Sequence, residues 1–418
     1  MQRSRLLVLI VMLTFFAISF LTNILGPIMP EANASFHMSL GLAGFLPFAF
    51  FIAYGVGSLP TGYLTDRYGT KKITLLGMLF AVIACLIFTF IPSLIVYLIS
   101  LFFMGLGLAM LQVVINPLLR TAGGEEHYSF YSVMAQMIFA CGSFGSPYVY
   151  SYLVQNLSNA QNGVLKILAI AAPTNMPWIS FYLVSSLLFA ILLLIIILVK
   201  FPKIQLTNDE KVEGLSIILQ LCKNKTVWVY FIGVFAYVGT EQGVALWISK
   251  FLNTYYQANP DTIGAHVSAL FWAGQALGCV IGLLLIKLLD QKIILASFVI
   301  AGMIILSLAL FGNYQIAIWA FPAFGFCTSV MYPGVFSLGL NSLSHNHGTF
   351  AGILCTAIIG GAVIPLLEGI IGNAIGLKFG MCLIYLTLAY QLAIAIFARP
   401  LVKNKTIFSS KRLISYDQ

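Results

Sequence analysis

The chain has 418 residues, of which 60% are hydrophobic and only 8% are charged, and its formal net charge is +9 at pH 7. Soluble domains carry roughly 25% charged residues, so this composition excludes a protein whose whole surface faces water. Apolar windows of roughly 20 residues, the helix length that crosses a bilayer core of about 30 Å, recur along nearly the whole sequence. Because a helix satisfies its own backbone hydrogen bonds in lipid, an all-α polytopic membrane protein is predicted.

Twelve transmembrane helices are predicted. In chain order they cover residues 6–28, 40–62, 73–92, 94–119, 130–154, 177–200, 227–251, 263–286, 293–311, 315–340, 349–372 and 379–398. Arg3 and Arg5 precede the first helix, as in a signal peptide, but its apolar run is too long and lacks a small-residue cleavage site. We therefore expect this segment to be retained as the first span.

The basic residues predict how the spans are oriented. With the N-terminus inside, eighteen of the 21 basic residues fall in cytoplasmic segments, and only Lys166, Lys250 and Lys378 lie at or near the opposite face. We expect a monomeric integral protein of the cell (inner) membrane, surrounded by lipid, with both termini cytoplasmic. The positive charge follows this topology, so no nucleic-acid partner is predicted.

The chain is expected to divide into two halves. Residues 1–200 are predicted to form an N-terminal six-helix bundle and 226–418 a C-terminal six-helix bundle with a cytoplasmic tail, because the longest charged stretch marks 201–225 as a cytoplasmic linker. Pro117 and Pro333 are 216 residues apart, and Pro147 and Pro365 are 218 apart, which indicates an internal repeat. Two pseudo-symmetric bundles predict a solute site near mid-membrane at their interface. Coincidental prolines are the alternative if these pairs are taken alone.

The loop after the second span carries a motif. It reads Gly62-Tyr-Leu-Thr-Asp66-Arg67-Tyr-Gly69-Thr-Lys71-Lys72. This sequence resembles the signature G-x-L-x-D-R-x-G-x-[RK]-[RK] of the major facilitator superfamily, which implies the major facilitator fold. An ordinary positively charged cytoplasmic loop is the alternative.

Physical chemistry suggests a gating role for this loop. Glycines allow a tight turn and close helix approach, and Asp66 can cap a helix or pair with a basic residue as a conformational latch. The predicted gating residues are Gly62, Asp66, Arg67, Gly69 and, as the partner of Asp66, Arg120. The second half keeps a degraded copy of the motif at Lys287, Asp290 and Lys292.

Further strings resemble the fucose/proton symporter family within this superfamily. They are Gly105-Leu-Gly107 to Gln112 and Asn116-Pro117, Met134-Ala135-Gln136, Tyr237-Val-Gly239-Thr-Glu241, Met331-Tyr332-Pro333 and Gly360-Gly361 to Glu368-Gly369. The resemblance touches both halves and implies a sugar:cation symporter. Where that family has two N-half acids and a helix-5 asparagine, this chain has Asn23, Gln112 and Phe139, and an amide cannot hold a titrating charge.

Two acids fall inside predicted spans. Because a carboxylate near mid-bilayer costs a few kcal/mol on insertion scales, Glu241 and Glu368 are the predicted coupling residues, exchanging H⁺ or helping to hold Na⁺. The loss of the two N-half acids suggests that the titrating group has moved to the helix of Glu368. Interhelical packing is the alternative for each acid.

Amides at similar depth compose a predicted sugar site, in which hydroxyls exchange hydrogen bonds with amides and the sugar ring stacks on an indole. The predicted substrate-binding residues are Asn23, Gln112, Asn116, Gln136, Gln242, Trp272 and Gln275. Interhelical hydrogen bonding is the alternative for any single amide.

These features favour a secondary active transporter that imports a sugar or similar small polar solute by H⁺ or Na⁺ symport through alternating access. A proton-coupled efflux antiporter, favoured by Phe139 and the lost acids, and a non-transporting membrane sensor are the alternatives. No enzyme, cofactor or metal is expected, because the cysteines lack ligand spacing and no nucleotide loop or nucleophile constellation is present.

Overall fold

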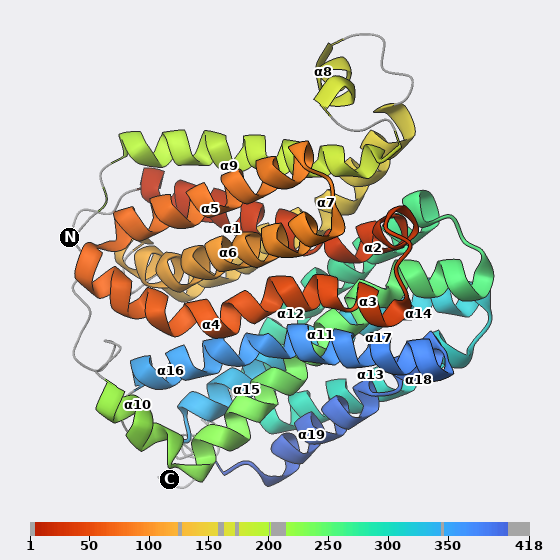
Figure 1. The fold of residues 1–418 in the computed structure, drawn as a ribbon. Coiled ribbons are helices and arrows are strands. Elements are labelled where there is room, and N and C mark those ends of the chain that lie inside the picture. Colours follow the sequence, from red (N-terminus) through yellow and green to blue (C-terminus); the bar gives the residue numbers. More distant parts are fainter. Residues whose placement is uncertain are drawn as a thin grey trace, which may run out of the picture.

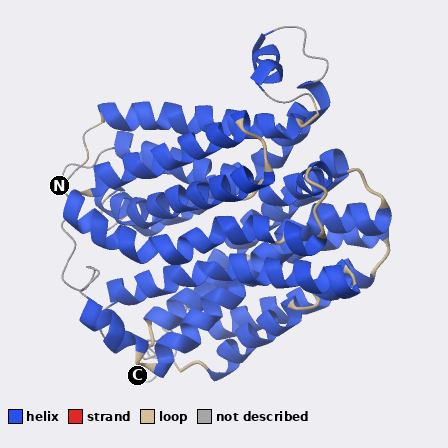
Figure 2. Cartoon of the chain, viewed as in Figure 1, coloured by secondary structure: helices blue, strands red, loops and turns tan. Residues whose placement is uncertain are grey.

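The computed structural model describes residues 5–123, 128–157, 163–171, 175–199, 201, 215–343 and 347–399. Throughout these ranges the regular elements are helices (Figures 1 and 2). The N-terminal half contains α1 Arg5–Thr22, α2 Leu25–Ser35, α3 Leu40–Ala43, α4 Phe45–Tyr68, α5 Thr70–Phe90, α6 Leu94–Gly123, α7 Tyr128–Asn156, α8 Gly163–Ala171, η3 Pro177–Ile179 and α9 Ser180–Leu198. Helix α10, Leu215–Cys222, follows in the predicted linker.

The C-terminal half repeats the pattern of long helices. It contains α11 Lys225–Tyr256, η5 Pro260–Gly264, α12 Ala265–Leu288, α13 Gln291–Phe311, α14 Tyr314–Thr328, α15 Met331–Leu340, α16 His347–Thr356, η6 Ala357–Ile359, α17 Gly360–Ile375, α18 Leu377–Met381 and α19 Ile384–Phe397. Eleven stretches of the described chain are long and apolar enough to cross a membrane. Helix α7, whose sequence is richer in Tyr, Ser and Gln, supplies the twelfth, and the prediction of twelve helices in two bundles is confirmed.

Several spans are broken, and prolines explain two of the breaks. Helix α1 ends before Asn23 and α14 ends before Ser329, each four residues before a proline, Pro27 and Pro333. Proline has no N–H, so the carbonyls of Asn23 and Ser329 lose their intrahelical donor, and the ring crowds the preceding turn. Broken helices of this kind place polar backbone inside the membrane, where transporters bind their solutes.

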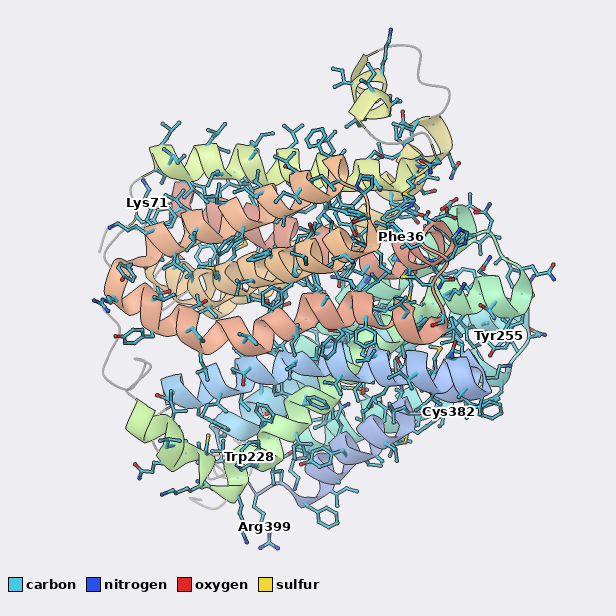
Figure 3. The ribbon with its side chains drawn as sticks, in the orientation of Figure 1. Phe36, Lys71, Trp228, Tyr255, Cys382 and Arg399 are labelled. Atoms are coloured by element: carbon cyan, nitrogen blue, oxygen red, sulfur yellow. The ribbon has the colours of Figure 1, made fainter. Side chains whose placement is uncertain are left out.

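The two halves lie side by side, with α1 to α9 on one side and α11 to α19 on the other (Figure 1). Helix α1 begins and α19 ends at the same end of the molecule, which we call the terminal end. The opposite end, with α2, α3 and α18, is the far end (Figure 1). Figure 3 labels Lys71 near the terminal end, and Phe36 and Tyr255 near the far end.

A lysine contact is repeated between the halves. Lys71 Nζ, at the start of α5, donates to the carbonyls of Ile197 and Val199 at 2.8 Å each. Lys292 Nζ, at the start of α13, donates to the carbonyls of Ile396 and Ala398 at 3.0 and 2.7 Å. Both lysines cover a helix C-terminus, where unpaired carbonyls and the helix dipole favour a cation. The basic end of the loop motif and its degraded copy thus share one structural role.

The halves meet through glycines toward the far end. A Cβ on Gly26 would lie 2.6 Å from the Ala245 carbonyl oxygen, and one on Gly369 would lie 2.6 Å from the Leu40 carbonyl oxygen. Only glycine allows backbones to approach so closely. Helix α2 therefore packs on α11, and α3 on α17, without side chains between them at these points.

Candidate transport site

Glu241 lies midway along α11, at the centre of a hydrogen-bonded cluster. Its Oε1 accepts from the Tyr237 hydroxyl at 2.5 Å and from Gln275 Nε2 of α12, and its Oε2 accepts from Gln242 Nε2 at 3.4 Å. Gln275 Nε2 also donates to the Tyr237 oxygen at 3.1 Å. All these donors are neutral, and Glu241 and Gln275 remain partly exposed. The cluster therefore offers a carboxylate and amides to a solute.

Aromatic rings lie beside the cluster. The ring centroids of Tyr237 and Tyr332 are 5.4 Å apart, and those of Tyr332 and Phe336 are 5.5 Å apart. Tyr332 and Phe336, both on α15 beyond the break at Ser329, are partly exposed. Flat apolar faces next to hydrogen-bonding groups suit a ring whose two sides differ in polarity, as in a sugar.

The cluster reaches the contact between the halves. A Cβ on Gly361 would lie 3.2 Å from Gln242 Cγ and 3.2 Å from Phe51 Cγ. Gln242 of the C-terminal half and Phe51 of the N-terminal half therefore both pack beside Gly361. Gln242 Oε1 is buried without a hydrogen-bond partner. The structure thus brings together three residues predicted to lie at the central site: Glu241, Gln242 and Gln275.

The N-half amides are more dispersed. Asn23 Nδ2 donates to Ser143 Oγ at 2.7 Å, which joins the α1–α2 break to α7, while its Oδ1 is buried without a partner. Gln112 is half-buried on α6, and Gln136 is exposed on α7. The Asn116 side chain lies outside the described residues.

Trp272 does not present an open face in this conformation. It is 3% exposed and packs edge-on against Phe271, with ring centroids 5.1 Å apart. The aromatic surface of the cluster comes instead from Tyr237, Tyr332 and Phe336. Tyr237 lies four residues before Glu241, the spacing at which helical side chains meet, and this spacing was the sequence signal for it.

Glu368 is placed quite differently from Glu241. It is 0% exposed within the C-terminal half, and neither carboxylate oxygen has a hydrogen-bond partner. The two acids predicted to be coupling residues therefore occupy an accessible site and a sealed one.

Three hydrogen bonds between described side chains join the two halves toward the far end. Tyr150 donates to Asp261 Oδ1 at 2.7 Å, and Lys250 Nζ donates to Asn33 Oδ1 at 3.0 Å. The third joins the Tyr148 hydroxyl and His266 Nδ1 at 2.7 Å. Sequence reasoning missed these pairs, because each joins residues more than 100 positions apart and no local spacing links them.

The structure describes only some side chains of the motif at residues 62–72. Gly62 is buried, and Gly69 joins α4 to α5 with φ of 88°, a left-handed value that favours glycine. The Arg67 guanidinium lies over the Tyr68 ring at 5.5 Å. The side chains of Asp66 and Arg120 lie outside the described residues, so their latch stays a prediction. Among the described residues, no group of three His, Cys, Asp or Glu is arranged to hold a metal.

Comparisons with known proteins identify the family to which this chain belongs. The family profile of the Major Facilitator Superfamily matches residues 11–365. The chain is 30% identical to a glucose/galactose transporter of Brucella abortus, with 90% of each chain covered. It is 24% identical to the L-fucose-proton symporter of Escherichia coli, covering 87% of this chain and 86% of that one.

Solved structures agree on the fold. A crystal structure of the E. coli fucose:proton symporter superposes with a TM-score of 0.68 at 20% identity, covering 94% of this chain and 98% of the other. A D-xylose-proton symporter gives a TM-score of 0.70 at 13% identity, covering 96% and 99%. The predicted resemblance is confirmed, and with it the prediction of a transporter rather than an enzyme. The chain is an integral membrane protein that belongs to the Major Facilitator Superfamily.

Proposed function

We propose that this protein imports a neutral hexose or a closely similar sugar across the inner membrane, coupled to the inward movement of a cation. The observation that carries the proposal is the cluster in which Tyr237, Gln242 and Gln275 surround the partly exposed carboxylate of Glu241. Its amides, carboxylate and neighbouring aromatic rings match the donors, acceptors and apolar face of a sugar. The names of the relatives, which include glucose/galactose and fucose carriers, support the same substrate class.

Charge narrows the substrate class further. Helix α11 carries no Lys, Arg or His between Lys225 and Lys250, and the donors to Glu241 are neutral. An ionised carboxylate whose donors are all neutral repels anions, so hexuronates and sugar phosphates are expected to be poor substrates. Neutral hexoses and amino sugars are the favoured solutes.

Transport is proposed to follow alternating access. The predicted halves, 1–200 and 226–418, rock about the central site, with 201–225 as the linker between them. If the termini are cytoplasmic, the far end is the outer face, and its three hydrogen bonds and close glycine contacts describe a conformation closed to the outside. Gly62, Asp66, Arg67, Gly69 and Arg120 are proposed to control the inner face, and the monomer is proposed as the working unit.

Uptake by purified protein in liposomes tests the proposal. Radiolabelled glucose, galactose and fucose are supplied under an imposed proton or sodium gradient, with empty liposomes as the blank. We expect accumulation by the wild type, loss of both accumulation and exchange in Glu241→Leu, and wild-type behaviour in Lys166→Ala on the exposed helix α8. The absence of flux of every sugar under both gradients contradicts the proposal. Gradient-driven extrusion of another solute would favour the efflux antiporter instead.

A further inference from the structure

Glu368 occupies a closed pocket inside the C-terminal half. A Cβ on Gly243 of α11 would lie 2.9 and 3.0 Å from its two carboxylate oxygens and 2.7 Å from Ile384 Cδ1. The missing side chain of Gly243 therefore leaves the room that the carboxylate fills. The pocket lies between α11, α17 and α19, and the carboxylate is fully screened from solvent.

Among the described residues, no lysine, arginine or histidine donates to the Glu368 carboxylate. The indole N–H of Trp247, one turn beyond Gly243, lies near the carboxylate, but no hydrogen bond of ordinary geometry joins them. Burying an ionised carboxylate without a partner costs several kcal/mol even after the protein relaxes. The neutral acid avoids this cost, so the closed pocket selects the protonated form.

The same surroundings do not suit a metal cation. Sodium sites in transporters draw their oxygen ligands from unwound backbone and helix ends. Helices α11 and α17 run unbroken past Gly243 and Glu368, and the one carbonyl that Pro365 leaves without a donor, that of Gly361, lies seven residues before Glu368. Of the neighbouring side chains, Ile384 offers a methyl group and Trp247 an N–H donor, and neither is a cation ligand.

We propose that Glu368 is a proton-binding site of the carrier, distinct from the sugar site at Glu241, and that the coupled cation is H⁺. The inference rests on the proposed sugar transport. One Oε atom gains a proton from the outer solution before the far end closes, and the same proton leaves the carrier to the inner solution once in each cycle. No oxidant, reductant or further ligand takes part.

The packing explains how the site is loaded and then sealed. A Cβ on Gly369, the next residue, would lie 3.1 Å from Trp247 Cζ2 and 2.6 Å from the Leu40 carbonyl oxygen of α3. The Trp247 ring and the N-half helix α3 thus meet at one glycine beside Glu368. In the proposed cycle, α3 leaves α17 when the halves part at the far end, and Glu368, next to this contact, gains access to outer water.

Infrared spectroscopy of the purified full-length protein tests the protonation directly. We expect a carbonyl-stretch band of a buried protonated carboxylic acid near neutral pH in the wild type and in Glu241→Gln, and its loss in Glu368→Gln. If the Glu368→Gln spectrum keeps every such band, the proposal is overturned. Glu368→Leu serves if the amide variant does not fold, because an apolar residue of similar size is well tolerated at a buried acid.

Transport in liposomes supplies the second readout. Glu368→Gln, in which the amide stands in for the neutral acid, is expected to retain exchange of labelled galactose or glucose across the membrane but to lose accumulation under a proton gradient. Wild-type accumulation by Glu368→Gln, or accumulation by the wild type under a sodium gradient at equal pH, overturns the proposal. A wild type that moves no sugar at all contradicts the proposed function, and the infrared band then still decides whether Glu368 holds a proton.

Discussion

The hydroxyl of Tyr150 donates to Oδ1 of Asp261 at 2.7 Å and so joins α7 of the N-terminal half to η5 of the C-terminal half. Asp261 lies at the start of the η5–α12 span, and Tyr150 is fully buried. In the proposed alternating access, this bond exists only while the far end is closed, because rocking of the halves separates its partners. It therefore belongs to one conformation of the transport cycle and biases the equilibrium toward it.

Removal of this bond is expected to open the far end. A hydrogen bond to a charged group contributes about 1.5–3 kcal/mol, which corresponds to a shift of roughly 10-fold or more in a two-state equilibrium. Tyr150→Phe should therefore increase hydrogen–deuterium exchange in α2 and at the start of α12, measured by mass spectrometry. Tyr152→Phe is the matched control, because that tyrosine is 57% exposed on the same helix. Equal exchange in both variants contradicts this role for Tyr150.

Close backbone contact should matter as much as hydrogen bonding at the far end. Gly26→Ala places a Cβ 2.6 Å from a backbone carbonyl of the opposite half, whereas Gly145→Ala meets nothing within 4 Å. We expect Gly26→Ala to slow sugar exchange strongly while sugar binding to the purified protein persists, and Gly145→Ala to behave as the wild type. Exchange is measured with labelled sugar in liposomes. A Gly26→Ala carrier with an unchanged exchange rate would show that this contact is not needed for closure.

The two donors that share Glu241 Oε1 should act together. Tyr237→Phe and Gln275→Leu each remove one donor to the carboxylate. Each is expected to weaken sugar binding by roughly 10-fold, the effect of losing a hydrogen bond to a charged group. Because the residues also contact each other, the double variant should lose less than the product of the two effects. Isothermal titration calorimetry provides the four affinities, and strict additivity argues against a shared site.

Solute competition tests the charge of the central site. Glucosamine should compete with labelled glucose uptake, while glucuronate, in which a carboxylate replaces the C6 hydroxymethyl group of glucose, should compete at least tenfold less well because of repulsion by Glu241. In Glu241→Gln this difference should shrink, because the repelling charge is gone. Equal inhibition by the two analogues in the wild type contradicts the assignment of Glu241 to the solute site.

The repeated lysine contacts predict a stability effect. Lys71→Met and Lys292→Met each remove two charge-assisted hydrogen bonds to a helix end, and each should lower the free energy of unfolding by about 1–2 kcal/mol. Lys72→Met, next to Lys71 but exposed, should have little effect. Thermal unfolding in detergent, followed by dye fluorescence, compares the three. Equal transition temperatures for Lys71→Met and Lys72→Met would contradict the proposal that Lys71 stabilises the end of a helix.

The sequence predicted the fold well because its main signal is local. Apolar windows and their polar breaks define each span without knowledge of its neighbours, and the twelve predicted ranges overlap the observed helices. Helix ends were less predictable. Helix α11, for example, extends to Tyr256, beyond the predicted end at 251, since polar residues can continue a helix past the apolar core.

The site was predictable only in part, because it depends on which helices face each other. The membrane depth of each residue correctly suggested that three residues lie together: Glu241, Gln242 and Gln275. Depth alone could not distinguish Glu241, which is partly exposed, from Glu368, which is fully buried. Burial of Trp272 against Phe271, and the pairing of Asn23 with Ser143, depend on helix rotation. A single sequence carries no signal for such rotations when a helix is apolar on every side.

The most direct test of cation-coupled sugar transport is a pH recording on a weakly buffered suspension of wild-type proteoliposomes. Addition of galactose or glucose, with no imposed gradient, should draw protons inward with the sugar and raise the external pH. The same addition should leave the pH unchanged in Glu241→Leu liposomes, which lack the proposed sugar site, and in Glu368→Gln liposomes, which lack the proposed proton site. Sugar entry into wild-type liposomes without any change in external pH would contradict proton symport.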